Sequence, residues 1–214
     1  VWRFLKTDGV ERVEGNKRVD IRFSLKDVVE DIFQTDKKVI FTMGKGVVGK
    51  TSIAAAIALG LSQMGKKVHL ATTDPAAHLH YVIRQSQNIT ISNIDEGKEL
   101  AKYKEEVLSK ARETMNDDDL AYIEENLRSP CTQEIAVFRA FAKVVDRSEN
   151  EVVVIDTAPT GHTLLLLDAT QSYHKEVKRT QGEVEEAVKK LLPRLRNADE
   201  TQVIIVTLPE ATPV

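Results

Sequence analysis

Two hydrophobic spacings alternate along this chain, and together they predict its elements. Continuous apolar runs typical of buried strands occur at residues 38–43, 67–72, 151–155 and 202–207. The run at 151–155 is nearly all valine and isoleucine, as a parallel strand buried on both faces should be. Between the runs, apolar residues recur every three or four positions, which is the spacing of amphipathic helices. The alternation predicts an α/β fold with a doubly wound, mainly parallel sheet.

Helical spacing is clearest at residues 24–33, where Ser24 and Asp27 have nearly the spacing of a capping box. Residues 96–127 are charged and helical in pattern, with a break near 116–119, and an edge strand is predicted at 88–94. Further helices are predicted at 51–64, 76–85, 131–145, 161–170 and 172–192.

Composition narrows the class of protein. The chain has 214 residues, 42% hydrophobic and 29% charged, which suits one α/β domain with a sizeable core. Its formal net charge of -3, without a basic run, gives no electrostatic reason to expect nucleic acid as a partner. The longest apolar run, 53–61, is too short to span a bilayer. A single cysteine permits no internal disulfide, which fits a reducing cytosol.

A phosphate-binding motif follows the first apolar run. Residues 44–51 read GKGVVGKT and fit G-x-x-x-x-G-K-[ST], between a predicted strand and a predicted helix. Such a loop aims backbone N–H groups at phosphate oxygens. Lys50 should reach the β/γ-phosphates and Thr51 should ligate Mg²⁺, so a nucleoside triphosphate and Mg²⁺ are the expected ligands. The predicted nucleotide-binding residues are Gly44, Lys45, Gly46, Val47, Val48, Gly49, Lys50, Thr51 and Ser52.

Two aspartates close neighbouring strands beside this loop. Ligands of doubly wound sheets bind at the carboxyl ends of strands, where Asp74 and Asp156 stand. Asp156 follows four apolar residues, as a Walker B aspartate does, and could hold Mg²⁺. Asp74 could orient the attacking water. Each could instead cap the next helix in the chain. The pattern favours a functional role for Asp156, whereas for Asp74 the cap is narrowly preferred.

Several longer motifs accompany the loop, in order, at residues 73–78, 127–132, 156–164 and 208–214. With Lys45 directly after the first glycine, the set resembles the arsenical pump (anion-transporting) ATPases, a family with a deviant Walker A loop. The likeness covers about 33–214 and is greatest to the family's second nucleotide-binding half. It implies an ATPase that drives arsenite or antimonite efflux through an integral membrane pump, paired with a homologous half or second subunit. A cytoplasmic location, peripheral to the membrane through the pump, would follow.

The resemblance assigns roles residue by residue. Lys45 would reach the phosphate of the other subunit, and Asp74 would activate water. Asp156 would begin the segment that transmits nucleotide state to the metalloid site. The residues that would bind As(III) or Sb(III) are Cys131, Ser129 and His162. From spacing alone, the preferred roles are a small buried residue for Cys131 and a hydrogen-bonded polar residue for His162.

The domain division follows from the same likeness. Residues 1–36 are predicted to form an N-terminal extension or linker, with a small hairpin and one amphipathic helix. Residues 37–214 are predicted to form the P-loop ATPase domain. The family's adenine-contacting segment lies past a later strand, so this domain is expected to be truncated at its C-terminus.

Val47 departs from the family, which has glycine there. A β-branched residue tolerates positive φ poorly, so Val47 is expected to take an ordinary backbone conformation. That substitution and the expected truncation leave open a nucleotide-binding module with little turnover. A related dimeric ATPase that targets protein clients is a further alternative, although this chain lacks the paired cysteines of that group.

Overall fold

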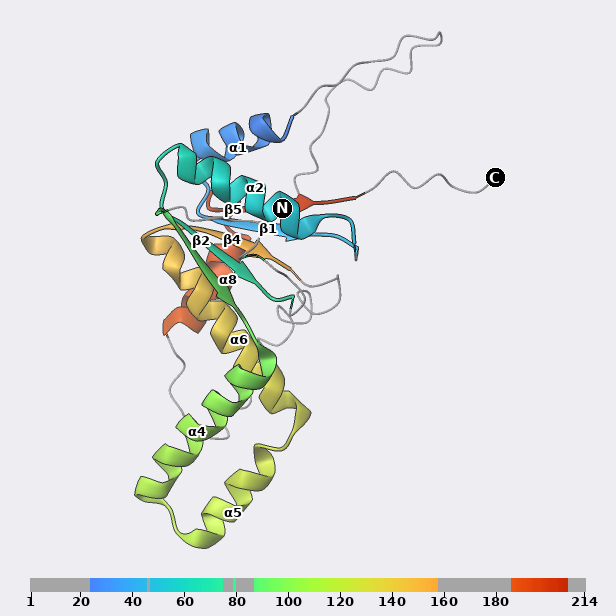
Figure 1. Ribbon diagram of the computed structural model, residues 1–214. Coiled ribbons are helices and arrows are strands. Elements are labelled where there is room, and N and C mark those ends of the chain that lie inside the picture. The colour runs from blue at the N-terminus through green and yellow to red at the C-terminus, as the bar shows by residue number, and fades with distance from the viewer. Residues whose placement is uncertain (1–23, 46, 75–78, 80–86, 158–185, 208–214) are drawn as a thin grey trace, which may run out of the picture.

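A fully parallel sheet of five strands is the centre of the described protein (Figure 1). The computed structural model describes residues 24–45, 47–74, 79, 87–157 and 186–207. The strand order β3-β2-β4-β1-β5 reverses direction beside β1, which confirms the predicted doubly wound α/β fold. The strands are β1 (Val39–Met43), β2 (Val68–Thr72), β3 (Ile89–Asn93), β4 (Val152–Asp156) and β5 (Thr201–Ile205).

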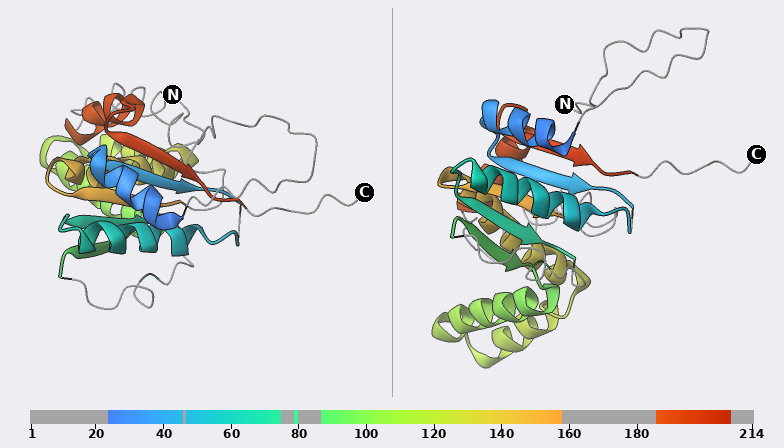
Figure 2. Two further views of the ribbon diagram at one scale, coloured as in Figure 1. Left: turned by 90° about the horizontal axis from the view of Figure 1, so that it is seen from above. Right: turned by 45° about the horizontal axis from the view of Figure 1, so that its top comes forward.

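Helices cover both faces of the sheet (Figure 2). One face carries α2 (Lys50–Gln63), with α1 (Leu25–Gln34) packed against it. The other face carries α6 (Pro130–Asp146) and α8 (Glu186–Arg196). Farther from the sheet, α4 packs against α6 and extends the molecule on that side, together with α5 (Figure 1). The bounds of the remaining elements are Glu96–Thr114 for α4, Asp117–Asn126 for α5 and Arg147–Glu149 for the 3₁₀ helix η1.

Alternation along each strand divides the core into two clusters. On β1, Val39 and Phe41 pack with α6 and α8, whereas Ile40 packs with α1 and α2. On β4, Val153 and Ile155 face the first cluster, whereas Val152 and Val154 face the second. Successive side chains of a strand point to opposite faces, and helices cover both faces here, so β1 and β4 read as almost continuous hydrophobic runs.

The helix α1 is fixed at its start and along its buried side. Ser24 and Asp27 form the full capping box, with each side chain bonded to the other residue's backbone N–H. Val29 and Ile32 are buried against α2. Gly60 of α2 makes this approach possible, because a Cβ there would lie 2.8 Å from a methyl carbon of Val29. A larger residue at position 60 would push the two helices apart.

The observed strands begin and end within about two residues of the predicted runs, and the helical break near 116–119 separates α4 from α5. The predicted hairpin in 1–23 and the helix at 161–170 lie outside the described residues, as does the segment 76–85 except for residue 79. Only 186–192 of the predicted helix 172–192 is described. The boundary between 1–36 and 37–214 stays a prediction. Within the described ranges, no helix is long and apolar enough to span a membrane.

His69 is a buried polar residue that joins the edge strand β3 to β2. Its Nδ1 lies 2.7 Å from the Thr90 hydroxyl and its Nε2 lies 2.8 Å from the Ser92 hydroxyl. Burial, and then the charge of Arg147, lower the pKa of His69 from 6.5 to about 4, against the opposing effect of Glu151. The neutral imidazole is therefore the form that the fold holds.

This pKa predicts a loss of stability in mild acid. As the pH falls below 6.5, the unfolded chain binds a proton at His69 before the folded chain does, so the free energy of unfolding decreases until the folded pKa near 4 is passed. Between pH 7.5 and pH 5 the loss should be about 2 kcal/mol. Denaturant unfolding at both pH values should show this loss in the wild type and a correspondingly smaller one in His69→Gln. Equal losses in the two proteins would contradict the assignment.

Candidate functional site

The loop between β1 and α2 is held against the end of β5. The Val206 N–H donates to the Met43 carbonyl at 2.7 Å, which extends the pairing of β1 and β5 beyond β5 itself. A Cβ on Gly44 would overlap the Val206 carbonyl oxygen. Position 44 therefore requires glycine, and the loop starts from a fixed point at the carboxyl edge of the sheet.

Lys50 is placed inside this loop at the start of α2. The residue is 6% exposed, and its Nζ donates to the Lys45 carbonyl at 2.8 Å. Gly49 is the N-cap at φ 93 and supplies no side-chain cap. The first N–H groups of α2 thus receive no acceptor from the cap side chain, and the positive end of the helix dipole adds to the Lys50 charge. An anion of phosphate shape fits such a loop.

Three hydroxyls surround the buried carboxylate of Asp156. Thr42 on β1 and Thr72 on β2 flank Asp156 at the same register of the sheet. Thr51 donates to Asp156 Oδ2 at 2.7 Å, and Thr72 donates to the same oxygen at 3.3 Å. Thr42 lies 3.5 Å from Asp156 Oδ1. The structure therefore brings the first turn of α2 and the ends of three strands to one carboxylate.

Burial raises the pKa of Asp156 above its ordinary value of 3.8, while hydrogen bonds from Thr51 and Thr72 and the charge of Lys50 oppose the shift. Asp74 adds a smaller upward effect through its own charge. The charge of Lys50 and the hydrogen bonds therefore do not fully compensate the ionised carboxylate for its loss of water. A hydroxyl and a carboxylate are hard oxygen donors of the kind that Mg²⁺ prefers, so the pair of Thr51 and Asp156 fits that ion.

Asp74 stands just past the end of β2, beside Asp156. Its backbone N–H donates to the Thr72 hydroxyl at 3.0 Å, and Thr73 N–H donates to the Asp156 carbonyl at 3.0 Å. The two predicted aspartates therefore belong to one cluster at the carboxyl edge. The residues 75–78 that complete the predicted motif lie outside the described part of the chain.

The expectation for the backbone of Val47 was wrong. Val47 has φ 62, in the left-handed region, and its side chain is fully exposed at 101%. The loop must connect the fixed Gly44 to α2 in few residues, and its closure overrides the preference of a β-branched side chain. The left-handed conformation costs about 1–2 kcal/mol for a residue with a Cβ.

The other predicted nucleotide-binding residues lie around this loop. Lys45, Gly49 and Ser52 are exposed, whereas Val48 and Thr51 are half-buried. Gly46 lies outside the described residues.

The predicted metalloid residues are described only in part. Ser129 is the N-cap of α6, its side chain accepts from the Cys131 N–H at 3.3 Å, and Pro130 is the first helical residue. Cys131 is therefore in the first turn of α6, as predicted, and it is exposed rather than buried. His162 lies outside the described residues. Within the part of the chain that is described, no three His, Cys, Asp or Glu side chains form a group that could hold a metal ion.

Comparison with known proteins agrees with the geometry of the loop. The family model for anion-transporting ATPases matches residues 37–211. The chain belongs to the anion-transporting ATPase family. It is 47% identical over 192 residues to an arsenical pump-driving ATPase of Escherichia coli and 46% identical to one of Acidiphilium multivorum. Both alignments cover 89% of this chain and 33% of the relative, so the chain spans about a third of their length.

ATPases with other names are also similar to this chain. The ATPase get3 of Schizosaccharomyces japonicus is 29% identical over 162 residues, which are 70% of this chain and 49% of the relative. Family membership therefore supports ATP hydrolysis by this chain.

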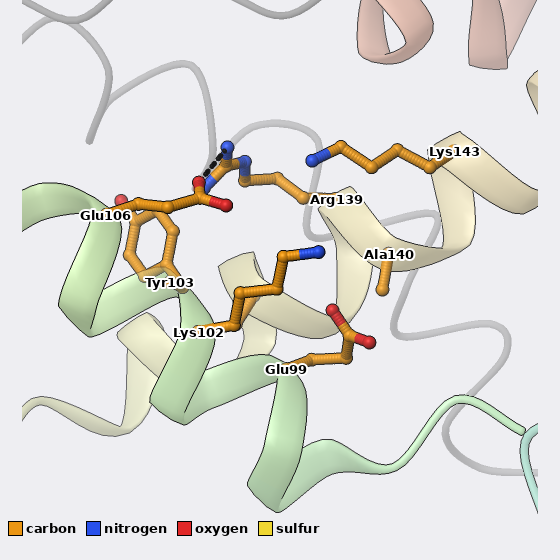
Figure 3. A pocket seen from close by; sticks show the side chains of 8 residues that line it. Glu99, Lys102, Tyr103, Glu106, Arg139, Ala140 and Lys143 are labelled. Carbon is orange, nitrogen blue, oxygen red and sulfur yellow. Dashed lines mark hydrogen bonds and ion pairs between the residues drawn. The ribbon is translucent and has the colours of Figure 1, made fainter.

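A small hollow between α4 and α6 lies on the sheet face opposite the loop helix α2 (Figure 3). Arg139 pairs with Glu106 at 2.9 Å and lies over the Tyr103 ring, 4.9 Å from its centroid. Lys102, Lys143 and Glu99 add further charges along the same seam. Two carboxylates offset two of the three cationic side chains, and the hollow coincides with the packing of α4 on α6.

The places of Thr42 and Thr72 beside Asp156 were not predicted from the sequence. Thr42 and Thr72 each sit at or one residue before the end of a strand, and Thr157 donates its hydroxyl to the Thr42 carbonyl at 2.7 Å. A threonine near the end of a buried apolar run, in two strands next to the one that carries Asp156, was the available signal. Whether such a threonine contacts Asp156 depends on the register between the strands, and that register is known only from the structure.

Val47→Gly should stabilise the protein. Glycine adopts positive φ without strain, but it adds entropy to the unfolded chain, so a net gain of about 1 kcal/mol is expected. Because the Val47 side chain is fully exposed, little packing is lost. Denaturant unfolding measures the gain, and Val47→Ala is the control, since it keeps a Cβ at the same φ. A glycine variant no more stable than the alanine variant would show that the loop carries no such strain.

Proposed function

We propose that this chain is a nucleotide-binding half that hydrolyses Mg²⁺-ATP, and that the hydrolysis drives arsenite or antimonite export through a membrane pump. The observation that carries the ATPase part is the 2.7 Å hydrogen bond from Thr51 to the buried Asp156, next to a buried Lys50. A strand, a loop and a helix thereby bring a cation, a hydroxyl and a carboxylate to one edge of the sheet, as a phosphate and its Mg²⁺ require.

Each residue of the site has a task in this proposal. Lys50 and the first N–H groups of α2 bind the phosphates. Thr51 and Asp156 hold Mg²⁺, which supplies charge neutralisation at the phosphates when bound. Asp74 orients the attacking water. Lys45 is exposed on the loop and is assigned to the phosphate of a nucleotide on a second ATPase half.

The arsenical part of the proposal rests on similarity and on Cys131. Two relatives at 46–47% identity are arsenical pump-driving ATPases, and each is about three times as long as the matched region. We infer that a homologous half pairs with this chain, at the cytoplasmic face of a membrane pump. Cys131 supplies a soft thiolate for As(III) or Sb(III), with Ser129 and His162 as weaker partners. Cys131 lies in the first turn of α6 and is exposed, so a ligand can reach its sulfur.

A nucleotide-binding module with little turnover is the second candidate. The observation that favours it is the left-handed, β-branched Val47 in the loop, since strain there could slow closure around the phosphates. Single-turnover hydrolysis of ATP, with and without antimonite, separates the candidates. Tight binding without hydrolysis would support the module, whereas hydrolysis insensitive to antimonite would support an ATPase with another role.

Lys50→Ala should weaken Mg²⁺-ATP binding by about 100-fold, because a buried charge-assisted contact to phosphate is lost. Calorimetry or a fluorescent nucleotide measures the affinity, and circular dichroism checks that the fold persists. Lys45→Ala is the matched control: it should retain most of the affinity and lower turnover, since its proposed phosphate belongs to the other half. Wild-type affinity in Lys50→Ala would reject the phosphate site.

In a protein that contains both halves, antimonite should stimulate ATP hydrolysis, and Cys131→Ser should remove most of the stimulation. Basal hydrolysis should change little, because Cys131 lies on α6 and not in the phosphate loop. A single thiolate cannot hold a trivalent metalloid firmly, so the site must be completed by other residues across an interface. Full stimulation in Cys131→Ser would reject the ligand assignment and leave the ATPase proposal standing.

A further inference from the structure

A continuous chain of hydrogen bonds joins the phosphate loop helix to the backbone of Asp74. Thr51 Oγ1 donates to Asp156 Oδ2 at 2.7 Å, and Thr72 Oγ1 donates to the same oxygen at 3.3 Å. The Asp74 N–H in turn donates to Thr72 Oγ1 at 3.0 Å. The Thr72 hydroxyl is therefore the link between the carboxylate beside α2 and the residue that begins the next segment of chain.

The position of Thr72 leaves its hydroxyl little choice of partner. Thr72 is the last residue of β2, is 2% exposed, and stands at the same register as Asp156 on the neighbouring strand. A hydroxyl has one proton to donate, and the Asp74 N–H already uses its oxygen as an acceptor. The proton is directed to the carboxylate, and the β-branched side chain holds that direction because its χ1 is restricted.

Thr42 provides a natural comparison on the other side of Asp156. It occupies the same register on β1, and its hydroxyl lies 3.5 Å from Asp156 Oδ1 and 3.4 Å from the Ile155 carbonyl. Thr42 is on the strand that leads to the phosphate loop, whereas Thr72 is on the strand that leads to Asp74. The two threonines thus share the carboxylate but lead into different segments of the site.

We propose that Thr72 is a positioning residue that holds the backbone of Asp74 in register with Asp156 and Thr51. The inference rests on the proposed ATPase function for its kinetic consequence, but the positioning itself is a property of the chain alone. Hydrogen bonds in a buried chain reinforce one another, so the Asp74 backbone should be held more tightly when the groups around Thr51 are fixed by a ligand. Asp74 is then placed correctly for water activation only while the Thr72 hydroxyl is present.

The direct test is amide hydrogen exchange at Asp74 in the protein without nucleotide. Thr72→Val keeps the shape and removes the hydroxyl, and it should speed exchange of the Asp74 amide by about tenfold, whereas Thr72→Ser should leave it near the wild-type rate. The Thr73 amide is the internal reference, because it donates to the Asp156 carbonyl and not to the hydroxyl. Exchange read by NMR resolves the Asp74 and Thr73 amides separately, so the two rates can be compared in each variant.

The kinetic test separates positioning from binding. Thr72→Val should lower kcat by about tenfold or more while KM and the nucleotide Kd stay within about threefold, since the lost interaction acts on the reacting step. Thr72→Ser should recover most of kcat. Thr42→Val removes a hydroxyl from the same carboxylate without touching Asp74, and it should lower kcat by no more than about threefold.

Unchanged Asp74 exchange in Thr72→Val would overturn the proposal, as would equal kcat losses in Thr72→Val and Thr42→Val. If Thr72→Val fails to fold, Thr72→Ala carries the same comparison, and equal acceleration at Thr73 and Asp74 in it would show a merely structural role. Failure of the wild type to bind nucleotide would reject the proposed function instead. The exchange measurement in the nucleotide-free protein would still decide whether Thr72 positions Asp74.

Discussion

A carboxylate buried away from water is stable only if hydrogen-bond donors or positive charges surround it. Asp156 is such a carboxylate, and it lies at the carboxyl edge of the central sheet. It is 0% exposed. The sheet meets part of the requirement with hydroxyls from the strands on either side, and α2 meets another part with Thr51. Burial still raises its pKa, so the site remains receptive to a cation. Residues of β1, β2 and α2 therefore all contact this one side chain on β4.

The two faces of the sheet differ in chemistry: polar groups gather at the carboxyl edge on one face, and large apolar side chains pack on the other. On the face of α2, the polar side chains of Thr42, Thr72 and Asp156 stand at the carboxyl ends of three neighbouring strands. On the opposite face, α6 and α8 bury large side chains such as Phe138, Phe141 and Leu191, and α4 is joined to α6 by the Arg139–Glu106 pair. Cys131 lies at the start of α6, so the proposed metalloid ligand belongs to the helical layer and not to the phosphate loop.

The strands were predictable because parallel strands buried on both faces are continuous apolar runs, which a local pattern reveals. The placement of Lys50, Thr51 and Asp156 together at one edge of the sheet was predictable, because each residue belongs to a motif with a fixed position relative to a strand or a helix. The role of Thr72 was not, since threonine is an ordinary strand residue and its value here comes from a register between strands far apart in sequence. Val47 was predicted wrongly because the geometry of loop closure, which no local preference encodes, decides its backbone.

The contact between Gly44 and Val206 has a consequence for the order in which the protein can acquire its shape. The start of the phosphate loop rests on residues that leave the ribosome last among those described, and β1 pairs on both sides with strands that come much later in the chain. Contacts of such long sequence separation make folding slow and leave strand edges open while synthesis continues. The nascent chain therefore cannot shape its phosphate loop early, and it is during this interval that assistance from chaperones would matter most.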